Sequence, residues 1–327
     1  MIPISVLDLV PVREGSDVAE ALAAAADYAR TAEAAGYARF WVAEHHAMEG
    51  IAGGATAVTL GHIGNATSTI RIGSGGIMLP NHSPFVIAEQ FGTLAALFPG
   101  RVDLGLGRAP GAGPILAQAL RKNLNQAAEY FPQDVVELRA LLTGDVDLPI
   151  KATPGFGAQV EMWMLGSSLF GAQLAAQLGL PYAFASHFAP AHLDEALSIY
   201  RRQFRPSAAL EKPHAMAAMS VIAGDSDDEA VLLASSQDQS FVRLRTGEPG
   251  KLPPPVENYR ASLPPQALAI LQSMEVARAV GGAATVRDKI LRFIERTQAD
   301  ELIVSGAVFD TEARKRSLTL TMEALKG

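Results

Sequence analysis

The chain has 327 residues, of which 49% are hydrophobic and 19% charged, and its formal net charge is −7. This composition supports a large buried core and excludes a disordered protein, and the negative charge argues against a general nucleic-acid or anionic-membrane surface. The chain contains no cysteine, which excludes disulfides, thiolate catalysis and cysteine–zinc sites.

The N-terminal segment MIPISVLDLVPVREG has no basic region followed by an apolar run, as a signal peptide would. No stretch of the chain reaches the ~20 apolar residues that a membrane-spanning helix needs. We therefore expect a cytoplasmic protein without a membrane or nucleic-acid partner.

Strand-like and helical patterns alternate along the chain. The first strand, at about 4–9, stops before Pro11, and Ser16 and Asp17 offer an N-cap for a helix that ends at Ala35 and is closed by Gly36. Further strands are predicted at about 39–43, 71–77, 101–106, 161–165, 182–185, 215–222 and 301–304. Helices are predicted at about 55–69, 84–97, 114–142, 168–178 and 191–204, with another at the C-terminus.

Eight strands, each followed by a helical pattern, predict a parallel sheet, and eight such units favour closure into a (β/α)8 TIM barrel. A doubly wound open sheet is the structural alternative, because periodicity does not report closure. Composition does not change between the two halves, so residues 1–327 are expected to form a single domain.

The segment at about 247–265 interrupts the alternation. It is too rich in proline for a helix or a central strand. It reads equally well as a surface linker between helices and as a lid, since loops that follow barrel strands lie on the active-site face.

Residues suited to ligand binding stand where four of the predicted strands end, which is where active sites of such barrels form. They comprise an imidazole, two glycines that leave the backbone uncovered, an arginine among glycines and two hydroxyls at a helix start. This set suits a ligand with a flat ring system and a phosphate tail. The residues are Glu44-His45-His46, Gly75-Gly76, Arg108 and Gly166-Ser167-Ser168.

Each of these features has a purely structural explanation. Gly75-Gly76 would let a planar ligand lie against the backbone, but taken alone it is more typical of a bulge or turn. Arg108 can pair with a phosphate or form a salt bridge at the barrel rim with Glu44. Ser167 and Ser168 at a helix start can bind an anion, although a serine N-cap is the commoner use, and only the combination with Arg108 favours a phosphate.

His45 and His46 are neighbours on an extended chain, so their side chains point to opposite sides. The two therefore cannot line one pocket together, and one functional imidazole with one structural partner is the sensible division. Taken alone, however, the pair favours two structural histidines. Without His-x-His or HExxH spacing and without cysteine, we expect no metal site, which also argues against a metal-dependent barrel hydrolase.

These residues resemble those of the bacterial luciferase-like flavin-dependent monooxygenases, a group of (β/α)8 barrels. The resemblance extends over most of the chain and is densest from Phe40 to Gly111. It is carried by AEHH at Ala43–His46, RIGSGGIMLPNHSPFVIAEQFGTLAALFPGRVDLGLGRAPG at Arg71–Gly111, and LGSS at Leu165–Ser168. Each piece is short, but their order and spacing at successive strand ends identify the family.

The resemblance implies roles for individual positions. His45 matches the catalytic histidine of the family, and Gly75-Gly76 matches the place where a non-proline peptide, often cis, meets the flavin. Arg108 matches the arginine that binds the FMN phosphate. Ser167 and Ser168 match the phosphate-contacting segment that follows the fifth strand. Glu44, Gly166 and, by looser alignment, Arg121 complete the expected cofactor-binding set. Luciferases carry a cysteine where this chain has Gly107, a difference that argues against light emission but not against flavin binding.

By the same resemblance, the chain is expected to use reduced FMN and O2 to oxygenate a small organic substrate. No nicotinamide fingerprint is present, so a separate flavin reductase would supply the reduced FMN, and a homodimer is usual in the family. The alternatives are an F420-dependent oxidoreductase that transfers hydride and a non-catalytic flavin-binding protein.

Overall fold

A computed structural model describes residues 1–109, 114–120, 124–145 and 147–326. The described part of the chain contains nine strands, all of which pair in parallel in one sheet. The strands are β1 Ile4–Asp8, β2 Arg39–Val42, β3 Arg71–Met78, β4 Val102–Gly107, β5 Glu161–Gly166, β6 Tyr182–Phe184, β7 Ala215–Ala223, β8 Arg278–Gly281 and β9 Glu301–Ser305.

The sheet closes into a barrel of eight strands. Its order is β6-β5-β4-β3-β2-β1-β9-β7-β8, and β6 also pairs with β7, which completes the circle without β8. Tyr182 of β6 lies opposite Ala215 of β7, and Met216 lies opposite Glu301 of β9. The predicted (β/α)8 barrel is therefore confirmed, and the doubly wound alternative is wrong.

The ninth strand, β8, was not predicted. It pairs only with the last residues of β7, Ser220–Ala223, and so extends the sheet beyond the barrel wall. Arg278–Gly281 is four residues long and contains an arginine and a glycine, so its sequence lacks the apolar run that marks the other strands.

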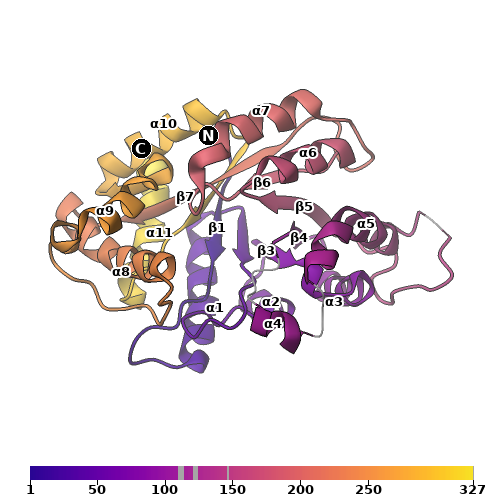
Figure 1. Ribbon diagram of the computed structural model, residues 1–327, viewed down its shortest axis with the longest axis horizontal. Coiled ribbons are helices and arrows are strands. Elements are labelled where there is room, and N and C mark those ends of the chain that lie inside the picture. Colours follow the sequence, from indigo (N-terminus) through magenta and orange to yellow (C-terminus); the bar gives the residue numbers. More distant parts are fainter. Residues whose placement is uncertain (110–113, 121–123, 146, 327) are drawn as a thin grey trace.

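Helices surround the strands in Figure 1. The α-helices are α1 Val18–Ala35, α2 Thr56–Ala66, α3 Pro84–Leu97, α4 Pro114–Ala119, α5 Leu124–Thr143, α6 Leu169–Leu178, α7 Leu193–Gln203, α8 Asp227–Thr246, α9 Pro265–Gln272, α10 Ala283–Thr297 and α11 Thr311–Lys326. Short 3-10 helices lie at η1 Leu79–Asn81, η2 Pro190–His192, η3 Tyr259–Ser262 and η4 Glu275–Ala277. No described helix is both long and apolar enough to cross a membrane.

The caps of α1 form as predicted. The Asp17 side chain accepts a hydrogen bond of 2.9 Å from the backbone N–H of Glu20, and Gly36 ends the helix in the left-handed conformation at φ 91°. In contrast, the helical region expected at 114–142 consists of two helices, α4 and α5.

Two main hydrophobic cores hold the barrel together, and a third, small cluster consists of Ile222, Ala234 and Val308. The larger one lies between the sheet and the helices, and the smaller one consists of Leu7, Trp41, Ala43, Trp163, Ala183, Met216, Ala218 and Ile303. In the smaller core, the rings of Trp41 and Trp163 meet edge to face at 5.3 Å. The smaller side chains of Ala43 and Leu165 lie two residues after Trp41 and Trp163. The bulky tryptophans therefore fill the part of the barrel interior nearer the starts of the strands.

A network of buried charges closes the end of the barrel where the strands begin. The fully buried Asp103 accepts hydrogen bonds of 2.9 Å from the Arg39 guanidinium and from the Trp41 indole, and it also pairs with Arg71. Arg39 continues the network to Glu301 at 3.1 Å. Burial raises the pKa of the Asp103 carboxyl, whereas the two guanidiniums act in the opposite direction.

Glu33, near the end of α1, makes the stability of the fold depend on pH. Its carboxylate accepts hydrogen bonds from the backbone N–H groups of Ser68, Thr69 and Ile70. Partial burial favours the protonated carboxyl, but these donors outweigh it and lower the pKa of Glu33 from 4.5 to about 2. Because the pKa is lower in the folded state, the resulting stabilisation is present above about pH 4.5 and is lost as the pH falls toward 2.

We expect Glu33→Gln to lower the free energy of unfolding most at pH 7, with a smaller difference from the wild type at pH 3. Urea unfolding of both proteins at the two pH values measures this difference. An equal difference at both pH values would show that the Glu33 charge does not contribute.

The segment 247–265 packs against the loops that follow β1 and β2. Leu252 forms a parallel bridge with Arg13, donates its N–H to the Val12 carbonyl at 2.8 Å and accepts from the Glu14 N–H at 2.8 Å. An added Cβ on Gly50 would approach the Gly250 carbonyl oxygen within 2.1 Å, so these backbones are in close contact. The segment thus lies at the end of the barrel where β1 and β2 finish. Its function as a lid stays a prediction.

Candidate active site

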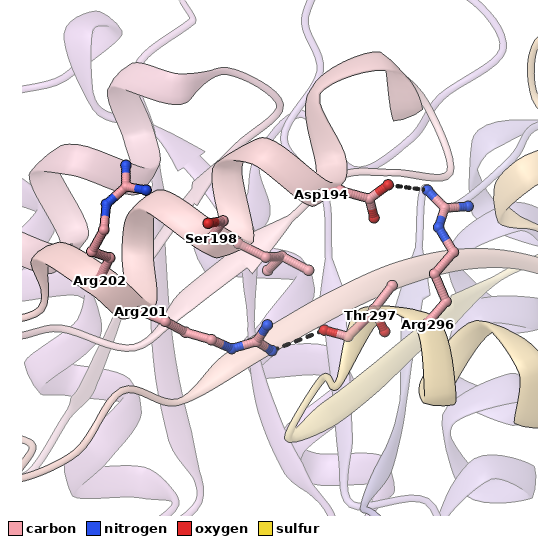
Figure 2. A pocket seen from close by; sticks show the side chains of 7 residues that line it. Asp194, Ser198, Arg201, Arg202, Arg296 and Thr297 are labelled. Atoms are coloured by element: carbon pink, nitrogen blue, oxygen red, sulfur yellow. Dashed lines mark hydrogen bonds and ion pairs between the residues drawn. The ribbon is translucent and has the colours of Figure 1, made fainter.

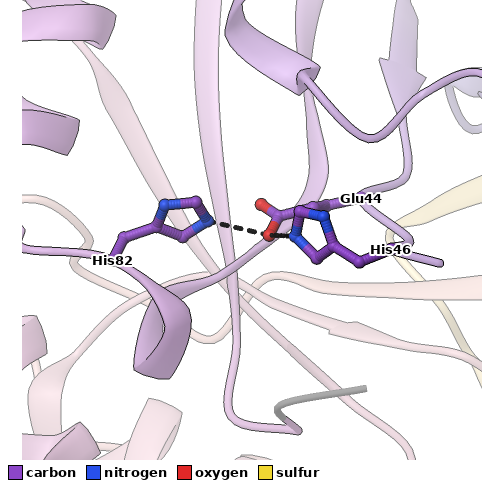
Figure 3. Close-up of side chains that lie close together, drawn as sticks. All are labelled: Glu44, His46 and His82. Atoms are coloured by element: carbon purple, nitrogen blue, oxygen red, sulfur yellow. Dashed lines mark hydrogen bonds and ion pairs between the residues drawn. The ribbon is translucent and has the colours of Figure 1, made fainter. Parts of the chain in front are cut away.

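A buried carboxylate at the end of β2 is held by two histidines (Figure 3). Glu44 is 2% exposed, and its Oε1 lies 2.6 Å from His46 Nε2 and 2.8 Å from His82 Nε2. Its Oε2 accepts from the backbone N–H of Met78 at 3.2 Å. The loops after β2 and β3 are therefore joined through one side chain.

The network keeps Glu44 ionised. Burial of Glu44 favours the neutral acid, but the hydrogen bonds and charges of His82 and His46 outweigh it and lower its pKa. An ionised carboxylate can only accept, so both imidazoles present an N–H from Nε2. One carboxylate and two histidines, with ligand atoms within 4.8 Å of one another, are also a set that transition metals bind. The expected absence of a metal site stays a prediction.

His45 occupies a different environment from His46, as the alternation of side chains predicts. Its side chain is partly exposed, and within the described part of the chain it makes no hydrogen bond. Burial lowers the pKa of His45, and the nearby His46 lowers it further. The negative charge of Glu44 raises it, but the net result is a pKa below the usual value. His45 is therefore a neutral imidazole at pH 7, free to accept or donate a proton.

Gly75 and Gly76 are joined by a cis peptide bond, as the resemblance implies. Both glycines are also required by packing: a Cβ on Gly75 would approach Leu7 Cδ1 within 2.5 Å, and one on Gly76 would approach the Gly105 carbonyl oxygen within 2.7 Å. The pairing of β3 with β4 shifts its register between Ser74 and Ile77, which makes this a strand irregularity as well. Contact with a cofactor stays a prediction.

Arg108 follows β4 and lies against the first turn of α6. Its guanidinium carbon stands 4.2 Å from the centre of the Phe170 ring, and the residue is exposed. Within the described residues, Arg108 has no carboxylate partner, so the salt bridge with Glu44 that the sequence also allowed is not formed. A cation is thus stacked in place without being neutralised.

The residues of the predicted anion site at the start of α6 lie beside Arg108. Gly166 ends β5, and Ser168 is the N-cap of α6 in an extended conformation, but its hydroxyl makes no capping hydrogen bond. The first turn contains no acidic residue. Within the part of the chain that the structure describes, the helix start therefore offers N–H groups and an uncapped serine hydroxyl beside an arginine without a carboxylate partner. Arg121, the looser candidate for this site, lies outside the described residues.

The large apolar side chains in and after β5 and β6 could line a substrate site, but they take different positions. Trp163 fills the barrel interior, whereas Met162 and Met164 point outward and are buried under the helices. Phe188 lies after β6, is 42% exposed and packs against Phe241 of α8. Among these, the buried tryptophan and methionines belong to the core, as is more usual for such residues.

A groove of about 690 Å3 between α7 and α10 lies on the outer helices (Figure 2). Two of its three arginines have structural partners: Arg201 donates to the Thr297 carbonyl at 2.9 Å, and Arg296 pairs with Asp194 at 2.7 Å. These contacts cap the end of α10 and tie it to α7. The groove is therefore separate from the residues at the strand ends.

Two features of the site were not found from the sequence. Glu44 and His46 are two residues apart on an extended chain, which places both side chains on one side, and this spacing could have revealed their contact. His82 lies after η1 and has no local motif. The contact of Arg108 with Phe170 joins segments that no local pattern relates.

The comparisons with known proteins agree with this geometry. The family model described as luciferase-like monooxygenase matches residues 2–301. A luciferase-like monooxygenase of Escherichia coli (strain K12) is 49% identical over 323 residues, which cover 98% of this chain and 96% of that protein. The solved structure of apo-MsnO8 superposes with a TM-score of 0.89 at 33% identity and covers 100% of this chain and 99% of its own.

More distant structures share the fold. The oxygenating constituent of 3,6-diketocamphane monooxygenase from Pseudomonas putida, solved with FMN, has a TM-score of 0.73 at 17% identity, with 99% of this chain and 98% of that chain covered. An F420-dependent secondary alcohol dehydrogenase has a TM-score of 0.70 at 16% identity, with 100% and 99% covered.

Proposed function

Because the chain belongs to the luciferase-like monooxygenase family, we propose that it is an FMN-dependent monooxygenase. It would take reduced FMN from a separate flavin reductase and insert oxygen from O2 into a small organic substrate. The observation that carries the choice of cofactor is Arg108, which stacks on Phe170 in the first turn of α6 and has no carboxylate partner among the described residues. The same helix begins at Ser168, whose hydroxyl makes no capping hydrogen bond.

The residues present fit FMN. Arg108 and the N-terminal segment of α6, with Gly166, Ser167 and Ser168, would hold the phosphate through charge-assisted and backbone hydrogen bonds. Gly75-Gly76 would present bare backbone to the flat ring system. Reduced FMN, when bound, supplies the electrons that activate O2.

In this proposal His45 moves the proton. Its imidazole is neutral at pH 7 and has no hydrogen-bond partner in the described chain, so it can act as general base and then as general acid. The network of Glu44 with His46 and His82 holds the adjacent backbone and thereby positions His45.

Two other functions make different predictions. An F420-dependent hydride-transfer enzyme, suggested by the fold of the secondary alcohol dehydrogenase, would bind F420 more tightly than FMN. A non-catalytic flavin-binding protein would bind FMN but would show no turnover. An anaerobic titration with each cofactor, followed by rapid mixing of the reduced FMN complex with oxygen and candidate substrates, distinguishes the three.

We expect Arg108→Ala to weaken FMN binding by about 1.5–3 kcal/mol, or roughly 10- to 150-fold in Kd, because a charge-assisted contact with the phosphate is lost. Anaerobic fluorescence titration with FMN measures the effect. Arg202→Ala, on the outer face of α7, is the matched control and should leave the Kd unchanged. An unchanged Kd for Arg108→Ala would remove Arg108 from the phosphate site.

The chain is further proposed to form a homodimer through helices beside the early strands. Val58 on α2 and Leu97 at the end of α3 are 75% and 61% exposed, so the helices that follow the second and third strands present apolar side chains to a second copy. Sedimentation equilibrium tests this, and Val58→Asp should shift the protein toward the monomer. A protein that is monomeric at all concentrations would contradict it.

A further inference from the structure

Arg108 is held in an unusual way among the arginines that stack on an aromatic ring. Its guanidinium carbon lies 4.2 Å from the centre of the Phe170 ring, and such contacts are attractive out to about 6 Å. Within the described part of the chain, Arg108 has neither an ion pair nor a hydrogen bond to a protein group. The other described arginines that stack on a ring each also donate to a carbonyl or carboxylate oxygen: Arg13, Arg39, Arg101, Arg245 and Arg314. The ring of Phe170 is therefore what holds Arg108.

The stack leaves the hydrogen-bond donors of Arg108 available. The ring covers one face of the guanidinium, whereas the N–H groups lie in the plane of the guanidinium and point outward from its edge. Because Arg108 is exposed, a ligand can reach these donors from the solvent. A guanidinium that is held by its face keeps the planar array of donors that matches two oxygens of a phosphate.

Phe170 is itself fixed by its surroundings. It is the second residue of α6, is partly buried and packs against the larger hydrophobic core. The backbone just before it is tied to the barrel, since the hydroxyl of the buried Tyr182 donates to the Ser168 carbonyl at 3.3 Å and the Ala185 N–H donates to the Gly166 carbonyl at 3.0 Å. The ring therefore provides a rigid surface for a side chain that would otherwise sample many rotamers.

The stack also keeps the positive charge of Arg108 at the start of α6. Gly107, the last residue of β4, lies opposite Leu165 of β5, so Arg108 leaves its strand beside Gly166. The first turn of α6 contains no acidic residue that would attract the guanidinium away from the ring. The charge and the N-terminus of the helix thus lie together before any ligand is bound.

We propose that Phe170 is a positioning residue for the cofactor phosphate, which it serves by holding the Arg108 guanidinium at the start of α6. This inference rests on the proposed function, since it concerns the FMN site. Phe170 acts through Arg108 and makes no contact with the phosphate itself. Because the arginine is already ordered in the free protein, less conformational entropy is lost when FMN binds.

A double-mutant cycle tests whether Phe170 acts through Arg108. Phe170→Leu keeps an apolar side chain but removes the ring, and it should weaken FMN binding about 2- to 5-fold, the range expected for an exposed cation–π contact. In the Arg108→Ala background the same substitution should have no further effect. Anaerobic fluorescence titration with FMN gives the Kd of the wild type, both single variants and the double variant. An equal loss with and without Arg108 would overturn the proposal.

Two further substitutions separate the stack from the volume of the side chain. Phe170→Tyr keeps the aromatic ring and should bind FMN as the wild type does. Phe170→Met fills much of the same space without a ring and should resemble Phe170→Leu, so the test does not depend on the folding of one variant. A tyrosine variant as weak as the leucine variant, or a methionine variant as strong as the wild type, would contradict the stacking role.

Riboflavin, which has the ring system of FMN but no phosphate, shows whether the effect belongs to the phosphate. Phe170→Leu should leave the Kd for riboflavin unchanged, and an equal loss of affinity for both flavins would overturn the proposal. Phe204→Leu is the matched control, since Phe204 is also partly buried against the larger core but lies at the far end of α7. It should leave the binding of both flavins unchanged.

The same titrations separate this proposal from the function on which it rests. If the wild-type protein bound no FMN, the proposed function itself would fail. If FMN bound and Arg108→Ala weakened the binding, whereas Phe170→Leu matched the wild type, the role of Phe170 alone would fail.

Discussion

His45→Ala should lower the rate of substrate oxygenation by about 10²- to 10⁴-fold, the usual contribution of a positioned acid or base. FMN binding should remain near that of the wild type, because His45 is assigned to proton transfer and not to the phosphate. The rate of product formation after rapid mixing of the reduced FMN complex with O2 and a substrate that the wild-type enzyme oxygenates measures the effect.

The matched control for this prediction is His62→Ala on α2. His62 is exposed and lies on an outer helix, so its loss should leave turnover unchanged. His45→Gln keeps a hydrogen-bonding group but cannot exchange a proton near pH 7, and it should be as slow as His45→Ala. Normal turnover in His45→Ala would mean that the proton is moved by another group.

Asp103→Ala should destabilise the fold by about 3–5 kcal/mol, the usual cost of breaking a buried ion pair by removing one partner. Arg39 and Arg71 would lose the buried carboxylate that they share, and they would keep Glu301 and the more exposed Glu161. The Trp41 indole would lose its acceptor. Urea unfolding at pH 7 measures the free energy of unfolding, with the transition checked for two-state behaviour.

Asp225→Ala is the control for this prediction. Asp225 pairs with Arg316 on the surface, where both side chains are more than half exposed, and exposed pairs contribute little because water already solvates them. If Asp103→Ala unfolded at the same urea concentration as the wild type, the ion pairs and hydrogen bonds of Asp103 would make no contribution to stability. FMN binding by folded Asp103→Ala should be unchanged, since the network lies at the opposite end of the barrel from Arg108.

The barrel could be predicted because its strands carry strong local signals. Apolar runs such as Ile4–Asp8 and Ala215–Ala223 are buried along their whole length, as strands covered on both faces are. β8 carries no such signal, and it becomes a strand only because β7 is long enough to pair with it beyond the barrel. The strand conformation of β8 therefore depends on its pairing with β7 and not on the propensities of its own residues.

The candidate site was predicted less completely, for physical reasons. Strand ends could be located from the sequence, so the positions of His45, Gly75 and Arg108 at one end of the barrel followed from the fold class. Side-chain partners could not, because they depend on distances between loops. His82 follows a short 3-10 helix and has no motif around it, so its contact with Glu44 could be found only in the structure.

The pairing of the first strand with the last has a consequence for biosynthesis. Ile4 lies opposite Leu302, so one edge of β1 has no partner until almost the entire chain has left the ribosome. Open strand edges in a growing chain invite pairing with other chains, and contacts between distant residues form slowly. A protein truncated before β9 should therefore aggregate, and overproduction should respond to chaperones that shield the nascent edge.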